Sequence, residues 1–213
     1  MRGHIIIHLL IAWIAISCAI PSAYSQAPGY RIKDLQLRRP HDYAAHQSFQ
    51  KLTIGAYPCD EPEKTEEIFD TDLLLDHGIL PILIVISNQN DFPVQLSASD
   101  IYLVDRNGEL HQSLRYSDVL LRLYLDKRPS QYTVREEILI DEFVEPNALI
   151  DFKQKSFGEE VIGPGTDGFG VVFFPLPEKR DLSGFRLYFP RIVNVAKNEP
   201  LVFFEFELLR SQP

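Results

Sequence analysis

The stretch from Ile79 to Gly108 constrains the fold more than any other part of this chain, because it is typical of three short strands separated by turns. In its first strand, Ile82–Ile86, isoleucines alternate with other mostly apolar residues, and β-branched side chains at this density favour a pleated strand over a helix. Turn-forming residues follow at 89–93, and Asn107-Gly108 suits a turn that needs positive φ. The stretch therefore predicts a mainly β fold, and it carries no catalytic chemistry of its own.

The strand Ile82–Ile86 is apolar on both faces, so one face requires a covering layer besides the β core. The preceding sequence predicts a helix over Asp60–Asp76. Asp60 stands at the N-cap position with Glu63 at N3, and Gly78 is placed to end the helix in a left-handed conformation. We expect this helix to pack on the sheet.

The later sequence predicts a second helix over Ser117–Arg128, set within a long connection, and an extended segment at Ala148–Phe152. Residues 135–147 fit either a strand or a short helix. From Val161 onward the pattern returns to strands, and neither an internal repeat nor an interdomain linker interrupts residues 49–213. We predict one domain over 49–213, preceded by a tether or edge segment over 26–48.

The first 25 residues have the pattern of an export signal, with Arg2 followed by an apolar core over Ile5–Ile20. This core is too short to be a typical membrane-spanning helix. Small residues at Ala23 and Ser25 favour cleavage after Ser25, which would release a free periplasmic protein. The alternative is a lipobox ending at Cys18, which would make the protein a lipoprotein, but a Cys in an apolar signal core is most often a small hydrophobe.

The chain is acidic, with 30 Asp and Glu against 21 Lys and Arg and a formal net charge of −9. Removal of a leader that contains Arg2 would make this charge more negative by one. Such a surface repels phosphate backbones and anionic headgroups, so we predict no nucleic-acid partner and no membrane contact other than a lipid at Cys18.

After removal of the leader, Cys59 would be the one remaining cysteine, so no intramolecular disulfide framework is predicted. Free cysteines are among the most buried residues, and we expect Cys59 to be buried. Its place at a predicted helix N-terminus leaves open a lowered thiol pKa.

Two motifs resemble binding loops, but the sequence around them lacks the features that such loops require. Gly163, Gly165 and Gly168 satisfy GxGxxG, yet a strand follows them where a dinucleotide site requires a helix, so we predict an inter-strand turn. Asp105, Asn107 and Glu109 alternate as in a calcium loop but lack the EF-hand spacing, so we predict an ordinary hairpin turn.

The histidines show no HExxH or other zinc spacing, and no serine stands in a GxSxG elbow. His41 with Asp42 and His46 offers at most a weak metal site. We therefore assign no catalytic, cofactor-binding or metal-binding residue.

The order of several short motifs resembles a known family. Asn88 and Pro93 flank the first turn, Ser97 or Ser99 with Asp100 leads to Val104-Asp105 and Gly108, and Pro164-Gly165 precedes Gly170 to Pro177. This order is similar to the telokin-like, immunoglobulin-like domains of uncharacterised bacterial secreted proteins and lipoproteins. The resemblance covers about 80–209 and implies an immunoglobulin-like β-sandwich with one helix on a sheet face. It brings no catalytic residues.

The sequence thus predicts an exported, non-enzymatic cell-envelope protein, a binding or structural module whose envelope partner is unknown, acting through a sheet edge or loops. One alternative is an envelope hydrolase or metal-dependent enzyme, which requires His41, His46 or Cys59 to meet carboxylates. Another is a carrier of a small apolar ligand, with a pocket lined by Phe173, Phe204 or Tyr188.

Overall fold

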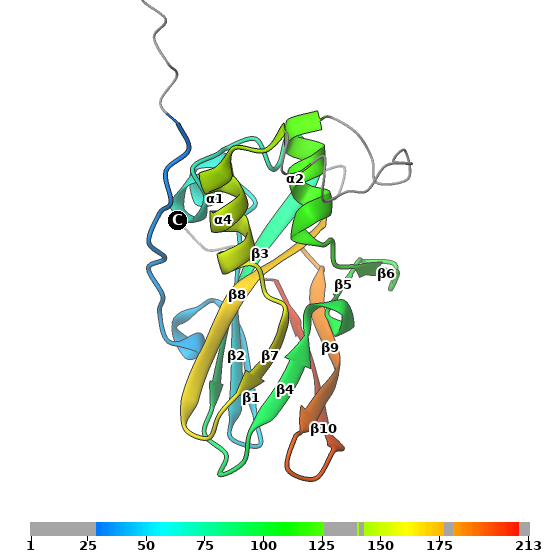
Figure 1. Cartoon of the computed structure of the whole chain (residues 1–213). Helices are drawn as coiled ribbons and strands as arrows, with labels where there is room; N and C mark the ends of the chain where they lie inside the picture. Colours follow the sequence, from blue (N-terminus) through cyan, green and yellow to red (C-terminus); the bar gives the residue numbers. More distant parts are fainter. Residues whose placement is uncertain (1–28, 126–139, 141–142, 177–180, 209–213) are drawn as a thin grey trace, which may run out of the picture.

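The computed structural model describes residues 29–125, 140, 143–176 and 181–208, and it is mainly β with two sheets (Figure 1). The first sheet has four strands in the order β1-β2-β3-β8, and all neighbours are antiparallel. Its strands are β1 (Ala45–Phe49), β2 (Leu52–Pro58), β3 (Ile79–Asn88) and β8 (Thr166–Pro175). The strand predicted from the isoleucine run is confirmed, and it lies at the centre of this sheet.

The second sheet is organised around β9, which pairs with β10 on one side and with both β4 and β5 on the other. The short 3-10 helix η2 separates β4 from β5, so this side of the sheet is interrupted. Short strands β6 and β7 complete the two ends. The bounds are β4 (Val94–Ser97), η2 (Ala98–Asp100), β5 (Tyr102–Val104), β6 (Leu110–Gln112), β7 (Glu159–Ile162), β9 (Arg186–Asn194) and β10 (Glu199–Glu207).

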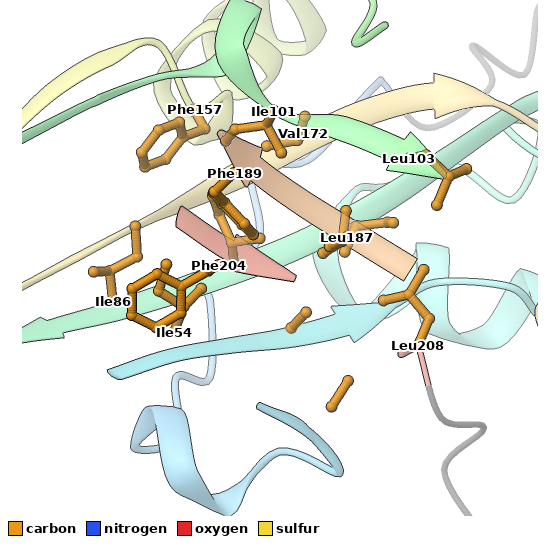
Figure 2. Packing of buried hydrophobic residues seen from close by; sticks show 14 of the residues in the cluster. Ile54, Ile86, Ile101, Leu103, Phe157, Val172, Leu187, Phe189, Phe204 and Leu208 are labelled. Atoms are coloured by element: carbon orange, nitrogen blue, oxygen red, sulfur yellow. The ribbon is translucent and has the colours of Figure 1, made fainter. Parts of the chain in front are cut away.

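The two sheets face each other across a shared hydrophobic core. Leu80, Ile82, Ile84 and Ile86 project from one face of β3 into this core, because alternate residues of a strand share a face. The second sheet contributes apolar residues that Figure 2 shows on β5, β9 and β10: Leu103, Leu187, Phe189 and Phe204. This core joins residues from both halves of the chain into one unit.

The opposite face of β3 is covered by helices, which confirms the need for a second layer. Leu83 and Val85 pack in a second core with buried residues of α1 (Pro62–Ile68), α2 (Tyr116–Leu125) and α4 (Pro146–Lys155). At its centre, the rings of Phe69 and Phe152 stack with their centroids 4.1 Å apart. The three helices gather over the upper part of β3 and β8 in Figure 1.

The predicted helix over Asp60–Asp76 was wrong in its start and its end. The N-cap is Glu61, whose side chain makes no capping hydrogen bond, and the helix ends at Ile68. Asp60 is instead buried and lies 2.6 Å from the ammonium of Lys64. Turns follow the helix, and Gly78 adopts positive φ (70°) at their end, just before β3.

The prediction of an extended segment at Ala148–Phe152 was also wrong, because these residues lie in α4. Glu145 caps this helix by accepting a hydrogen bond from the backbone N–H of Ala148 (2.9 Å). The second predicted helix is present as α2 up to Leu125, and the rest of Ser117–Arg128 lies outside the described residues, as does most of 135–147. Far from being an isolated connection, α2 belongs to the helix layer, with Val119–Leu121 fully buried.

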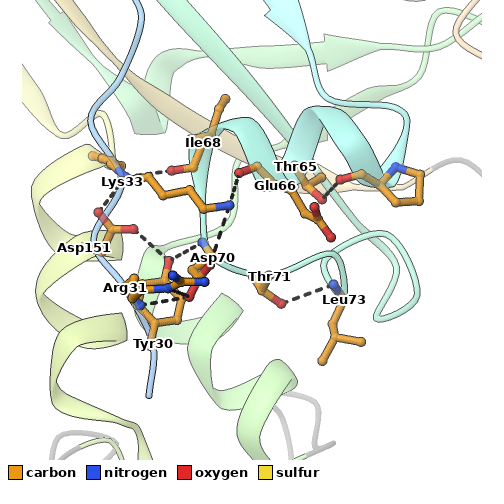
Figure 3. A network of polar contacts seen from close by, with 12 residues as sticks. Tyr30, Arg31, Lys33, Thr65, Glu66, Ile68, Asp70, Thr71, Leu73 and Asp151 are labelled. Carbon is orange, nitrogen blue, oxygen red and sulfur yellow. Dashed lines mark hydrogen bonds and ion pairs between the residues drawn. The ribbon is translucent and has the colours of Figure 1, made fainter. Parts of the chain in front are cut away.

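The segment 30–39, which we call the strap, has no regular structure and is fastened to the helix layer (Figure 3). The hydroxyl of Tyr30 donates to the carboxylate of Asp151 (2.7 Å) and accepts from the backbone N–H of Asp70 (3.1 Å). Asp151 is fully buried and lies 2.6 Å from the ammonium of Lys155. This network joins the strap, the end of α1 and α4.

The predicted leader 1–25, its cleavage site and Cys18 lie outside the described residues. None of the helices in the described part of the chain has the length and apolar character needed to cross a membrane.

Candidate functional site

A groove of about 660 Å³ lies beside the outer edge of β8 in the described structure. η2 forms one wall, the segment 112–117 that leads into α2 forms another, and the end of α4 with residues 156–158 forms the third. The β8 residues Val171–Phe173 lie at its base.

Two crossings of the chain over the edge of β8 build this groove. The backbone N–H of Leu114 donates to the carbonyl of Phe173 (2.7 Å), and the N–H of Phe157 donates to the carbonyl of Val171 (2.9 Å). The second crossing is so close that a Cβ at Gly170 would lie 2.8 Å from the backbone of Phe157. A larger residue at position 170 would clash with the Phe157 backbone, so glycine is needed for the chain to cross β8 this closely.

The groove has an apolar base and a rim rich in hydroxyl groups. The apolar residues include Phe157, buried in the core between the sheets, and Phe173, buried in the helix-side core. The others are Leu114, Ile140, Val171 and Val172. Five serines from three separate segments contribute hydroxyls: Ser97, Ser99, Ser113, Ser117 and Ser156.

Most of these hydroxyls hold the walls in place. Ser113 donates to the carbonyl of Ala98 (2.8 Å) and thereby ties the segment before α2 to η2. The hydroxyls of Ser97 and Ser99 bond to each other (2.9 Å). The walls are therefore organised before any ligand arrives, which lowers the entropic cost of binding.

The described lining of the groove contains two cations, and they differ in their partners. Arg115 reaches Asp118 with two hydrogen bonds (3.1 and 3.0 Å), so its charge is paired with a carboxylate. Lys153 is exposed on α4, and its ammonium has no hydrogen bond or ion pair within the described residues. The lining that the structure describes contains no Asp, Glu, His or Cys side chain.

The structure does not bring the candidate hydrolase residues together. His41 is exposed beside Asp42 (3.2 Å), and His46 Nδ1 lies 2.7 Å from the carbonyl oxygen of Tyr43. Cys59 is fully buried in the helix-side core, as expected, and burial raises the pKa of its thiol. Within the described residues neither histidine nor Cys59 joins a group of three metal-ligating side chains.

The turn at Asp105–Gly108 is a hairpin turn between β5 and β6, as predicted, and Gly108 adopts positive φ (83°). Asp105 accepts hydrogen bonds from the backbone N–H groups of Asn107 and Glu109, which hold the pKa of its carboxyl below the usual range. Ligand atoms of Asp105, Glu109 and His111 lie within 4.8 Å of one another. His111 was not part of the sequence motif, and the hydrogen bonds of the turn account for the position of the Asp105 carboxylate.

The residues proposed for a carrier pocket lie in three different places. Phe173 lines the groove, while Phe204 is buried between the two sheets. Tyr188 lies on β9 between the buried residues Leu187 and Phe189, and its ring contacts Phe203. The glycines 163, 165 and 168 lie at the predicted inter-strand turn and the first part of β8, with no helix behind them.

Comparisons with known proteins add little to this geometry. No protein-family model matches the chain, and no curated protein sequence matches it. Among solved structures, the yjhA protein from Bacillus subtilis is similar over 53% of this chain and 56% of its own, with 12% sequence identity and a TM-score of 0.31. This chain therefore spans little more than half of that protein, and a likeness at this level carries no argument about fold or function.

Proposed function

We propose that this protein is an exported, non-enzymatic binding module of the bacterial cell envelope that holds its ligand in the groove beside β8. The proposal rests on a preorganised groove whose described lining contains hydroxyl, apolar and basic side chains and no His, Cys or carboxylate. Its volume of about 660 Å³ lies within the range of roughly 300–1,000 Å³ that small-molecule sites occupy.

The chemistry of the lining favours binding over catalysis. A serine nucleophile or a metal-activated water needs an adjacent general base or a set of metal ligands. Histidine, cysteine and carboxylate side chains are missing from the described lining, whereas hydroxyls and apolar side chains are abundant. Such surfaces bind ligands through shape, apolar contact and hydrogen bonds.

The two sheet edges offer little room for a partner that would dock by adding a strand, and this favours the groove as the binding site. The edge of β8 is crossed by Leu114 and Phe157. The edge of β10 lies near β1, where the backbone N–H of Glu205 donates to the side chain of Gln47 (3.0 Å). The long strands at both sheet edges are thus partly covered by the chain itself.

A groove-filling substitution tests the proposal with the fluorescent dye Nile red as an apolar probe. Gly158 lines the groove, and a Cβ at this position meets no atom within 4 Å, so Gly158→Phe places a ring there without a backbone clash. Gly29→Phe is the matched control, because a Cβ at Gly29 also meets nothing and Gly29 lies outside the groove. We expect Gly158→Phe to weaken Nile red binding by about tenfold, or about 1.4 kcal/mol, because the ring takes up space in the groove that the dye would otherwise fill. Equal binding by both variants would contradict the proposal.

We also propose that residues 1–25 are a leader removed by cleavage after Ser25, with lipidation of Cys18 as the alternative route to the envelope. The apolar core at Ile5–Ile20 supports export by either route. The intact mass of protein purified from a bacterial envelope fraction tests this step. A mass beginning at Gln26 supports cleavage, a diacylglycerol-modified Cys18 supports the lipoprotein route, and an uncleaved chain in the cytoplasm contradicts both.

We propose that the two facing sheets are an immunoglobulin-like sandwich of the telokin-like type. Two of the motifs that resemble the family fall on turns between strands, Gly108 between β5 and β6 and Pro164-Gly165 between β7 and β8, and this supports the proposal. An experimental structure tests it: sheets aligned within about 30° support it, and a near-orthogonal crossing contradicts it.

A further inference from the structure

We propose that the ligand of the groove is a small anionic amphiphile, an apolar chain with one carboxylate, whose head group is held by Lys153. The inference rests on the proposed binding function of the groove and names the class of ligand. The apolar base would receive the chain, and the ammonium on α4 would face the carboxylate at the rim.

The charge of the lining is opposite to that of the chain as a whole. The protein carries 30 Asp and Glu and a net charge of −9, whereas the described lining includes Arg115 and Lys153 and not one carboxylate. A cationic ligand would find many carboxylates elsewhere on the surface but none in the described lining of the groove. Local charge complementarity therefore favours an anion at this place.

Lys153, more than Arg115, would attract the carboxylate of the ligand. Asp118 is mostly buried and accepts two hydrogen bonds from the guanidinium of Arg115, so that cation already has its counter-charge. The ammonium of Lys153 has no such partner within the described residues. A ligand carboxylate would give Lys153 an ion pair without displacing one.

The rest of the lining matches an apolar chain. Phe157, Val172 and Phe173 lie below the rim and connect the groove to both hydrophobic cores. Figure 2 shows Phe157 and Val172 at the upper side of the core between the sheets. Burial of an apolar chain against the partly exposed Ala98, Leu114 and Tyr116 supplies the main driving force, and the charged head sets the orientation.

Displacement of Nile red by three ten-carbon amphiphiles, each below its micellar concentration, tests the ligand class. The probes are decanoate, decanol and decyltrimethylammonium, which share a chain and differ in head-group charge. We expect decanoate to displace the dye at a concentration about fivefold lower than decanol and lower still than decyltrimethylammonium, as befits one partly exposed ion pair. Lys153→Gln should remove the preference for decanoate, whereas Lys197→Gln, in the exposed turn between β9 and β10, should keep it.

The outcomes separate the ligand class from the binding function. If the three amphiphiles displace Nile red equally, or if Lys153→Gln keeps the preference, the anionic class is wrong while the groove remains a binding site. If a short apolar peptide with a free C-terminal carboxylate displaces the dye and decanoate does not, a peptide ligand replaces the amphiphile. If Nile red binding itself is insensitive to Gly158→Phe, the proposed function fails together with this inference.

Discussion

Removal of one hydroxyl group, by Tyr30→Phe, should weaken the attachment of the strap to the helix layer, which Arg31 and Lys33 also hold through Asp70 and Glu66. This hydroxyl donates to the fully buried carboxylate of Asp151 (2.7 Å) and accepts from the backbone N–H of Asp70 (3.1 Å). Burial and the nearby Asp151 raise the pKa of Tyr30, so the phenol keeps its proton and remains a donor throughout the physiological pH range. A hydrogen bond to a charged group contributes about 1.5–3 kcal/mol, so we expect the free energy of unfolding to fall by about 2 kcal/mol.

Urea unfolding at neutral pH, followed by circular dichroism, measures this loss, and thermal unfolding should show a decrease in Tm of about 4–8 °C. Tyr188→Phe is the matched control, because the Tyr188 hydroxyl makes no hydrogen bond within the described residues, and it should change stability by less than about 0.5 kcal/mol. In an Asp151→Asn background the effect of Tyr30→Phe should shrink, since the two side chains are coupled. Equal effects of Tyr30→Phe and Tyr188→Phe would refute the role assigned to the network.

Three further predictions concern single positions. Cys59 should resist alkylation in the native protein at pH 8 and react fully in urea, because it is completely buried and burial raises its thiol pKa; fast labelling of the native protein would contradict this. Gly170→Ala should destabilise the protein by about 1–3 kcal/mol in urea unfolding, because its Cβ would lie 2.8 Å from the Phe157 backbone, whereas Gly158→Ala, which meets no atom, should be close to neutral. For Asp181, hydrogen bonds from the hydroxyl and N–H of Ser183 and from Arg106 hold the carboxyl pKa below its usual value. A lowered pKa contributes stability above the unfolded-state pKa of about 3.9 that is lost as pH falls through the folded-state value, so the parent should exceed Asp181→Asn in stability at pH 6 and lose this advantage in strong acid. A difference that is constant from pH 6 to pH 2 would contradict the assignment.

The strand β3 and the β5–β6 turn could be predicted from the sequence, because short local residue patterns specify them. Period-two alternation marked β3, and Asn107-Gly108 marked the hairpin turn between β5 and β6. The two-sided apolar character of Ile82–Ile86 also predicted a covering layer. It could not specify which segments supply that layer, because three helices distant in sequence contribute to it.

The helix errors have identifiable physical causes. Asp60 matched an N-cap pattern, but it is buried beside Lys64, and the cap position falls one residue later. Ala148–Phe152 has apolar residues that fit a strand, and its true signal, Glu145 before Pro146, lies upstream of the segment considered. The first error thus arose because Asp60 pairs with Lys64 and does not cap α1, and the second because the cap of α4 at Glu145 was missed.

The groove could not be predicted from the sequence, because its lining comes from separate segments that only the fold unites. Single serines carry no signal of their own, and Lys153 resembles any basic residue in the last turn of a helix. Of the residues proposed for a ligand pocket, Phe173 alone lines the groove. Gly170 was visible as a glycine in a strand, which often marks a close backbone approach.

The central claim is that the groove beside β8 binds a ligand, and amide chemical-shift mapping with decanoate tests it most directly. We expect the perturbed resonances to cluster at 97–99, 112–117 and 156–158, around the base formed by Val171–Phe173. In Gly158→Phe the same shifts should need about tenfold more decanoate. Perturbations spread over the outer strands, or centred on the turn between β9 and β10, would contradict the account.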